Sequence, residues 1–321
     1  MKCSREVFTL LSVLTVGVGI TCNLTLGAQG FDSNGLWLDI ALTNNTAAFT
    51  VHALTTNTDG VYDLYFKTNL IDDQDWTWLS RCASGRTNFT VNNLPPGQAF
   101  FRLGITNAIR PGFDQQFLDR NDDGSTGIVP MGFFINYFGS SNAMLYVNNN
   151  GNVTFGDALS IYAPTPLNQL GQSGITNIIA PYWADVDTRN TASDVVKYGT
   201  NMVDGHAAFG VDWVNVGYYN SQADKLLSCQ LVIIDRSDIT PGDFDMEFNY
   251  FKVQWEWGSA SSNVPPRAGY SDGIDDYELP GSGVEGAFLD TNVVTGLIYH
   301  NLNSSVPGRY FFCFRNGKLL P

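Results

Sequence analysis

The chain has 321 residues, of which 44% are hydrophobic and 13% aromatic, so it can form substantial hydrophobic cores and is long enough for two domains. Its 31 acidic side chains outnumber the 17 basic ones, which gives a formal net charge of −14 at pH 7. Such a surface repels nucleic acid and anionic lipid and argues against both as partners.

The amino end has the pattern of a signal peptide. Lys2 and Arg5 precede an apolar run at residues 7–20, which is short for a membrane span, and residues 27–28 are small enough for a signal peptidase. We therefore predict that residues 1–28 are removed and that the chain is secreted. A lipoprotein acylated at Cys22 is the weaker alternative.

The predicted mature chain, starting near Gln29, is more acidic than the whole. The signal peptide contains two of the 17 basic and one of the 31 acidic residues, which leaves 15 against 30 and a net charge of about −15. No later segment has 18 uninterrupted apolar residues, so we expect no membrane span after signal removal.

Alternation of apolar and polar residues indicates strands throughout the rest of the chain. It is clearest at residues 36–42, 62–66, 244–250 and 310–314, with Gly-, Pro- and Asn-rich turns between such runs. We find no capped helix of confident length. The pattern predicts an all-β fold of β-sandwiches, with helix confined to short turns.

The strand pattern divides into two parts. Residues 31–104 are typical of a small sandwich of the immunoglobulin or fibronectin type III kind. Residues 105–113 contain a Pro-Gly pair and have no clear period, so we expect a linker there. Residues 114–318 are then the second, larger domain.

Three cysteines follow the signal peptide, and three cannot all pair internally. Cys229 and Cys313 lie in apolar strands, so a bridge between them is conceivable in an oxidising compartment and would leave Cys82 as the odd thiol. Free, partly buried cysteines are at least as well supported.

The second domain contains a series of characteristic motifs in a fixed order. They are NDDGS (121–125), LYVNNNGNVTFG (145–156), IIAPYWADVDTR (178–189), CQLVIIDRSD (229–238), GDFDMEFNYFKVQWEWG (242–258), RAGYSDG (267–273) and GRYFFCFRNG (308–317). Together they resemble the nidogen-type extracellular domain (NIDO), in the form common in secreted bacterial proteins. The resemblance covers nearly all of residues 119–318.

The resemblance implies a β-rich extracellular module that acts in adhesion between cells and matrix and has no known catalytic centre. Its partner would be an extracellular protein or a glycan. No cofactor is implied.

Two of these motifs contain structural signals of their own. In VNNNGNVTF, the Asn-Gly pair suits a hairpin turn, and Leu145, Val147, Val153 and Phe155 alternate as core residues of its two strands. In APYWADVDTR, Trp183 is large enough to anchor a core layer, so we expect it to be buried.

Asp185 and Asp187 are two residues apart and are expected to share one strand face with Arg189. We favour a solvent-exposed or Arg-paired cluster over a metal site, because calcium takes six to eight oxygen ligands and only two carboxylates are visible.

The segment DRNDDGS offers weak candidates for a calcium loop. Asp119, Asn121 and Asp123 fall at positions one, three and five, and Gly124 at six, as in an EF-hand. Pro130 stands at position twelve in place of the bidentate Glu, and a strand follows instead of a helix. An Asp-rich turn explains the same residues, with calcium left open.

Catalysis has little support in the sequence. His52, His206 and His300 are the only histidines, and no nucleophile elbow or zinc-binding motif accompanies them. Carboxylate pairs such as Glu247 with Glu256, or Asp185 with Asp243, can be nominated for a glycosidase, but acidic residues are abundant. We expect a protein without enzymatic activity.

The alternative is a secreted carbohydrate-binding or carbohydrate-active protein. Trp255 and Trp257 alternate beside Glu256, as in a sugar-binding platform. In a chain this aromatic, core packing is the simpler explanation.

Overall fold

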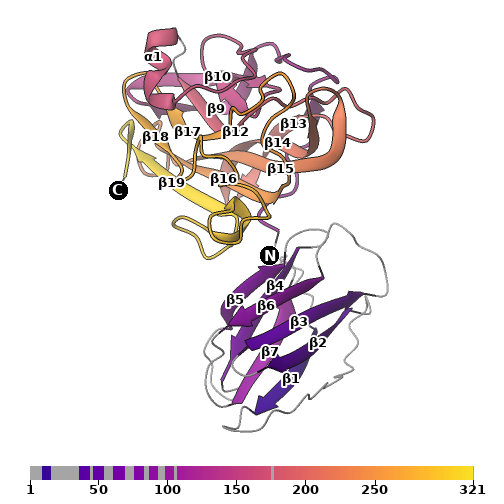
Figure 1. Ribbon diagram of the computed structural model, residues 1–321. Coiled ribbons are helices and arrows are strands. Elements are labelled where there is room, and N and C mark those ends of the chain that lie inside the picture. Colours follow the sequence, from indigo (N-terminus) through magenta and orange to yellow (C-terminus); the bar gives the residue numbers. More distant parts are fainter. Residues whose placement is uncertain are drawn as a thin grey trace. The chain divides into compact units, whose positions relative to one another are not determined.

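The computed structural model covers the second part of the chain almost completely and mainly the strands of the first. The described residues are 9–15, 36–43, 46–53, 61–68, 76–82, 87–92, 98–104, 107–174 and 177–320. They fall into two compact units, Met1–Asn107 and Ala108–Pro321 (Figure 1).

The first unit is a sandwich of a four-stranded and a three-stranded sheet, both antiparallel. The strand orders are β1-β7-β4-β5 and β2-β3-β6. The strands are β1 Thr9–Thr15, β2 Leu36–Thr43, β3 Thr46–Ala53, β4 Tyr62–Lys67, β5 Thr77–Cys82, β6 Asn88–Asn92 and β7 Gln98–Gly104.

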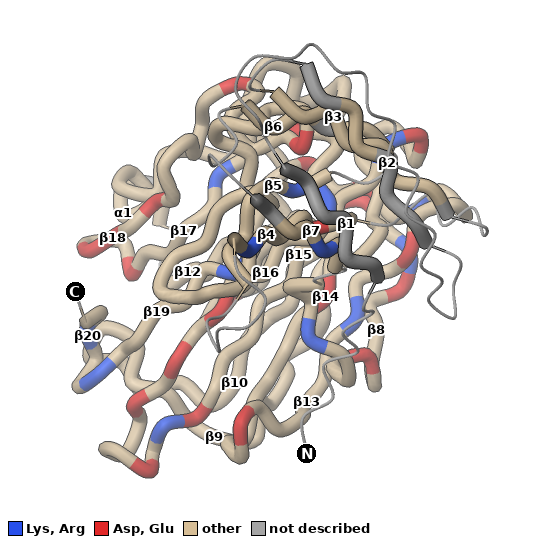
Figure 2. Tube along the Cα trace, turned by 90° about the horizontal axis from the view of Figure 1, so that it is seen from below, with Lys and Arg blue, Asp and Glu red and all other residues tan. Residues whose placement is uncertain are grey.

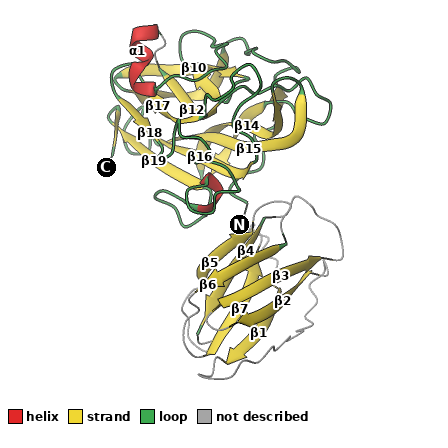
Figure 3. Ribbon diagram, viewed as in Figure 1, coloured by secondary structure: helices red, strands yellow, loops and turns green. Residues whose placement is uncertain are grey.

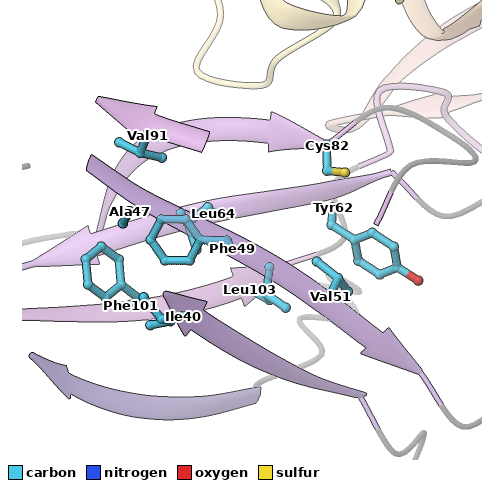
Figure 4. Packing of buried hydrophobic residues seen from close by; sticks show 10 residues of the cluster. All are labelled: Ile40, Ala47, Phe49, Val51, Tyr62, Leu64, Cys82, Val91, Phe101 and Leu103. Carbon is cyan, nitrogen blue, oxygen red and sulfur yellow. The ribbon is translucent and has the colours of Figure 1, made fainter. Parts of the chain in front are cut away.

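The core of this sandwich is drawn from both sheets (Figure 4). Phe49 of β3 meets Phe101 of β7 edge to face, with ring centroids 5.2 Å apart. Strand β1 lies within the predicted signal peptide and pairs with β7. Cleavage stays a prediction, and it would remove β1 and leave β7 at the edge of its sheet.

The second unit consists of a six-stranded and a seven-stranded sheet, again antiparallel. The orders are β18-β17-β12-β11-β10-β9 and β20-β19-β16-β15-β14-β13-β8. The strands are β8 Gln116–Phe117, β9 Val129–Tyr137, β10 Ser140–Asn148, β11 Asn152–Thr154, β12 Ile178–Trp183, β13 Lys197–Val203, β14 His206–Tyr218, β15 Gln222–Asp235, β16 Phe244–Val253, β17 Arg267–Ser271, β18 Asp276–Glu278, β19 Arg309–Arg315 and β20 Lys318–Leu319.

Aromatic side chains from the two sheets of this unit meet in its core. Tyr137 of β9 lies 5.8 Å from Phe314 of β19 and 6.5 Å from Phe244 of β16, measured between ring centroids. Phe244 and Phe314 stack at 4.7 Å. The two sheets therefore pack face to face.

Helix is confined to short pieces in the described residues (Figure 3). They are α1 Leu170–Ser173 and two 3-10 turns, η1 Leu167–Gln169 and η2 Leu297–Tyr299. The predicted all-β fold class is confirmed. None of the helices in this part of the chain combines the length and the apolar character needed to cross a membrane.

Strand β16 departs from the expected alternation of buried and exposed residues. Phe244, Met246, Phe248 and Tyr250 are buried, as the alternation indicates. Asp245, Glu247 and Asn249 on the opposite face are buried as well. Arginines cover that face: Arg315 binds Asp245 at 2.6 Å and Arg110 binds Glu247 at 2.7 Å. Ion pairing thus permits a polar strand face to lie inside the unit.

The expected linker at residues 105–113 is partly built into the second unit. Ala108 and Phe113 are fully buried. The backbone N–H of Arg110 donates to Gln230 Oε1 at 2.9 Å, and Gln230 Nε2 donates back to Arg110 O at 2.7 Å. Residues 108–113 are therefore part of a folded unit. The hydrogen bonds that hold them there cannot be predicted from the local sequence pattern.

The conceivable disulfide between Cys229 and Cys313 is not formed, and both are free thiols. Cys229 of β15 faces Tyr250 of β16, whereas Cys313 of β19 faces Asp245 of β16. Strand β16 lies between them, and two strand spacings are about 9–10 Å, too far for a bridge.

Candidate functional site

A hairpin turn with three successive buried asparagines forms the base of the candidate site. Strands β10 and β11 pair as predicted, with Asn148 opposite Asn152. Gly151 has a φ of +74°, and a Cβ there would lie 1.7 Å from the carbonyl oxygen of Tyr182, so only glycine fits. The turn is thereby pressed against β12.

The loop before β9 packs on this turn. The backbone N–H of Asn149 donates to Gly124 O, and that of Thr126 donates to Val147 O, both at 2.9 Å. Asn149 Nδ2 also donates to the carbonyl oxygen of Asp122. These bonds bring NDDGS beside NNNG, although the two motifs are more than 20 residues apart.

The segment after β12 also contacts the asparagine turn and the loop before β9. Val186 N donates to Asn150 Oδ1 at 3.0 Å, and Asn149 Nδ2 donates to Val186 O at 2.6 Å. Thr188 N donates to Asn121 O at 2.9 Å. Three segments that are distant in sequence therefore meet at one point of the second unit.

Three carboxylates converge where these segments meet. Asp122, Asp123 and Asp185 each offer an oxygen, and the three oxygens lie within 4.8 Å of one another. Asp185 is only 2% exposed, while Asp122 and Asp123 are half-buried. We call these three residues the aspartate cluster.

Burial and neighbouring negative charges make the charged form of Asp122 and Asp185 unfavourable. Burial and the charge of Asp187, against the opposing effect of Arg189, together raise the pKa of Asp122 to about 6. Burial also raises the pKa of Asp185 to about 6, opposed by the hydrogen bond from Ser261. Buried carboxylates that repel one another favour a bound proton or a bound cation.

Asp187 has a different environment from Asp185. Its carboxylate accepts the backbone N–H and the Nε of Arg189, each at 2.9 Å, and the N–H of Ser221 at 2.7 Å. Although burial raises it, these donors hold the pKa of Asp187 below its ordinary value.

The expectation for these two residues was therefore right for Asp187 and wrong for Asp185. Asp187 is paired with arginine, but both carboxylates are buried and neither is solvent-exposed. Strand β12 ends at Trp183, so strand alternation no longer applies at positions 185–187. The chain bends there, and the two carboxylates have different partners.

Of the three residues proposed for a calcium loop, the structure brings only Asp123 into the cluster. Asn121 Oδ1 accepts the N–H of Gly124 at 2.7 Å, and its Nδ2 donates to Asp119 O at 2.6 Å, so Asn121 caps a turn. The side chain of Asp119 is exposed. The loop does not have the EF-hand arrangement.

Sequence reasoning considered Asp185 and favoured another role for it, and it missed the other members of the site. Asp122 was passed over because it falls at position four of the calcium loop, which is not a ligand position. Asn149 lies in the motif at 145–156 and Ser261 in the segment between the motifs at 242–258 and 267–273, and only the tertiary contacts bring them together. The three consecutive asparagines were the one available signal, since a turn needs no more than one or two such residues.

Comparison with known sequences points to one family for the second unit. Residues 112–264 match a family described as NIDO related. This range contains the whole aspartate cluster. It supports a NIDO-type domain in the second unit.

The similar proteins are much longer than this chain. Mouse alpha-tectorin is 29% identical over 223 residues, which cover 60% of this chain and 10% of that protein. Human alpha-tectorin is 28% identical over the same length. Fruit fly nidogen is 27% identical over 220 residues, covering 59% of this chain and 15% of that protein. No solved structure matches.

Proposed function

We propose that the chain, whose second unit has a NIDO-type domain, is a secreted module that adheres to an extracellular protein. The match of residues 112–264 to the NIDO-related family carries this proposal. It is supported by the signal-peptide pattern and by the similarity to nidogen. The family resemblance associates such domains with adhesion between cells and matrix.

The environments of Glu247 and Glu256, one of the two nominated pairs, support a role without catalysis. Glu247 binds Arg110 at 2.7 Å and lies 3.5 Å from Arg309. Although burial raises it, these arginines hold the pKa of Glu247 below its ordinary value. Glu256 accepts the N–H of Gly286 at 2.9 Å through both oxygens. Each carboxylate is engaged with its own donors, as expected of structural residues.

The tryptophans proposed for sugar binding support a protein partner over a glycan. Strand β16 ends at Val253, so Trp255 and Trp257 do not share a strand face. Trp255 is 3% exposed, and its Nε1 donates to Val216 O at 3.2 Å. Trp257 is half-buried. A stacking platform needs exposed rings, and Trp255 cannot supply one.

The β9–β10 hairpin offers a contact surface for a protein partner. Phe134 on β9 and Met144 on β10 are 42% and 48% exposed, while the neighbouring Ile135 and Leu145 point into the core. Acidic and basic residues are interspersed along the trace of the second unit (Figure 2). Exposed apolar side chains among mixed charges are typical of a protein interface.

The test is a binding assay with the full chain, purified after secretion. It is applied to a panel of immobilised matrix proteins and to a glycan array. We expect saturable binding to a matrix protein, weakened at least tenfold by Phe134→Ser with Met144→Ser. The control is Val293→Ser with Val294→Ser, which removes apolar groups elsewhere that are even more exposed, at 60% and 73%. Binding to glycans alone would overturn the proposal in favour of the carbohydrate alternative.

A further inference from the structure

In each carboxylate of the aspartate cluster, one of the two oxygens has a protein partner. Asp123 Oδ1 accepts the Nδ2 of Asn150 at 2.9 Å, and Asp185 Oδ2 accepts the Oγ of Ser261 at 2.9 Å. Asp122 Oδ2 lies 3.0 Å from Arg189 Nη2. In each case a donor orients one oxygen. The other oxygen has no hydrogen bond to the described residues.

Burial makes this pattern unusual. Asp122 Oδ1 is fully buried and has no hydrogen-bond partner among the described residues. A buried carboxylate oxygen without a donor carries a large desolvation cost, so native structures rarely leave one unsatisfied.

Asn149 provides a second, independent sign of a missing ligand. It is 1% exposed, and its Oδ1 is buried without a partner in the described part of the chain. Its Nδ2 donates to the carbonyl oxygens of Asp122 and Val186, which fixes the amide orientation. These carbonyls belong to the segments that contain Asp123 and Asp185, so the amide is held between those segments with an acceptor oxygen unused.

We propose that Asp122, Asp123, Asp185 and the side-chain oxygen of Asn149 bind one calcium ion in the second unit. An ion that coordinates at 2.3–2.6 Å allows its ligands to be about 5 Å apart, and the cluster oxygens lie within 4.8 Å. All four ligands are hard oxygens, and no nitrogen or sulfur ligand belongs to the cluster, which selects against zinc.

The surrounding charges leave room for a divalent cation. Arg189, which forms an ion pair with the cluster, is shared between Asp187 and Asp122. Asp122, Asp123 and Asp185 with Asp187 thus carry four negative charges against one positive charge. Bound calcium would balance most of the remainder and join the loop at 121–126, the asparagine turn and the segment after β12.

The experiment measures calcium binding to the full chain, purified after secretion and treated with EGTA. We expect a single site by titration calorimetry, with a dissociation constant of roughly 10⁻⁴–10⁻³ M as in extracellular modules, and weaker binding of magnesium. Terbium should report the same site by sensitised emission, because Trp213 Nε1 donates to Asn149 O at 3.0 Å and places an indole beside it. Calcium should compete with terbium.

Asp185→Asn and Asp123→Asn are the decisive variants, because each keeps the side-chain shape and removes one charge. Both should lower calcium affinity at least tenfold. In EGTA each should melt at or above the wild-type temperature, because repulsion is relieved, whereas in millimolar calcium each should melt below it. A substitution that merely damages the fold would lower the melting temperature in both conditions.

Asp119→Asn is the matched control, since this exposed aspartate lies in the same loop outside the cluster. It should bind calcium as the wild type does. The proposal is overturned if the wild type shows neither heat nor a calcium-dependent melting shift. It is also overturned if Asp119→Asn loses binding while Asp185→Asn retains it.

Discussion

At the scale of single residues, Trp183 shows how a large side chain fixes a local core. The indole is fully buried with Leu159, Leu167 and Leu170, and its Nε1 donates to Ile161 O at 2.8 Å. Sequence alone predicted the burial, because a tryptophan after a proline in a strand motif suits a core position. The hydrogen-bond partner could not be predicted, since it lies in an irregular segment.

Trp183→Ala should destabilise the second unit by about 3–5 kcal/mol, because it removes the largest side chain of this cluster and leaves a cavity. Urea unfolding followed by circular dichroism measures the loss. Phe117→Ala, at a side chain 61% exposed, is the control and should change the stability little. Equal stabilities of the two variants would show that the indole does not anchor the core.

At the scale of elements, the alternation of apolar and polar residues identified the strands. It did not show which residues cover the polar faces of these strands. The residues of β10 and β11 behaved as predicted because a tight turn fixes the register of a hairpin. Polar residues of β14, β15 and β16 are buried instead, and they form ion pairs and side-chain amide hydrogen bonds across strands. Such cross-strand partners depend on sheet order, which local patterns do not encode.

Asp212 on β14 is one such buried polar residue, and it predicts a pH-dependent stability. It lies opposite Lys197 of β13 and Gln230 of β15, and Gln230 Nε2 donates to its Oδ1 at 2.7 Å. Burial and the charge of Asp114, opposed by Gln230 and Lys197, together raise its pKa to about 6. An ordinary aspartate in the unfolded chain has a pKa of about 3.9.

The folded state therefore binds this proton more tightly than the unfolded state. The stabilisation from Asp212 is complete below about pH 4 and is lost as the pH rises through about 6. Asp212→Asn, which can still accept from Gln230, should raise the unfolding free energy by up to about 3 kcal/mol at pH 7.5 and by less than about 1 kcal/mol at pH 4. Denaturant unfolding at both pH values measures this, and a loss of stability at pH 7.5 would contradict it. Asp157→Asn, the same substitution at an exposed aspartate, is the control.

At the scale of the whole molecule, sequence predicted two β-rich parts better than the site that the second part contains. The strand periods and turn residues are local signals. The aspartate cluster is assembled from three distant segments, and its central amide belongs to a turn that was interpreted only as a fold determinant. Asp123 alone was among the predicted ligands, because the calcium-loop spacing treats ligands as neighbours in sequence.

A polar clamp of Arg110, Glu247 and Arg309 holds the start of the second unit. From it we predict how residues 107–110 respond to protease. Arg110 binds Glu247 through Nε at 2.7 Å and Nη2 at 2.8 Å, and Arg309 Nη2 donates to Ala108 O at 2.8 Å. Glu247 is 1% exposed. Removing Arg110 leaves this buried carboxylate with Arg309 and the amide of Asn249 as its partners in the described residues.

Arg110→Ala should therefore destabilise the second unit by about 3 kcal/mol, at the lower end for a broken buried ion pair because Arg309 remains. It should also loosen residues 107–110, so that thermolysin cleaves there at a denaturant concentration that leaves the wild type intact. Arg236→Ala is the matched control: it removes a similar partner from Asp245 of the same strand, where Arg315 remains, and it does not touch residues 107–110. Similar destabilisation with cleavage near residue 110 only in Arg110→Ala is the expected result. Equal cleavage of both variants at that point would mean that global unfolding, and not the clamp, controls access to the segment.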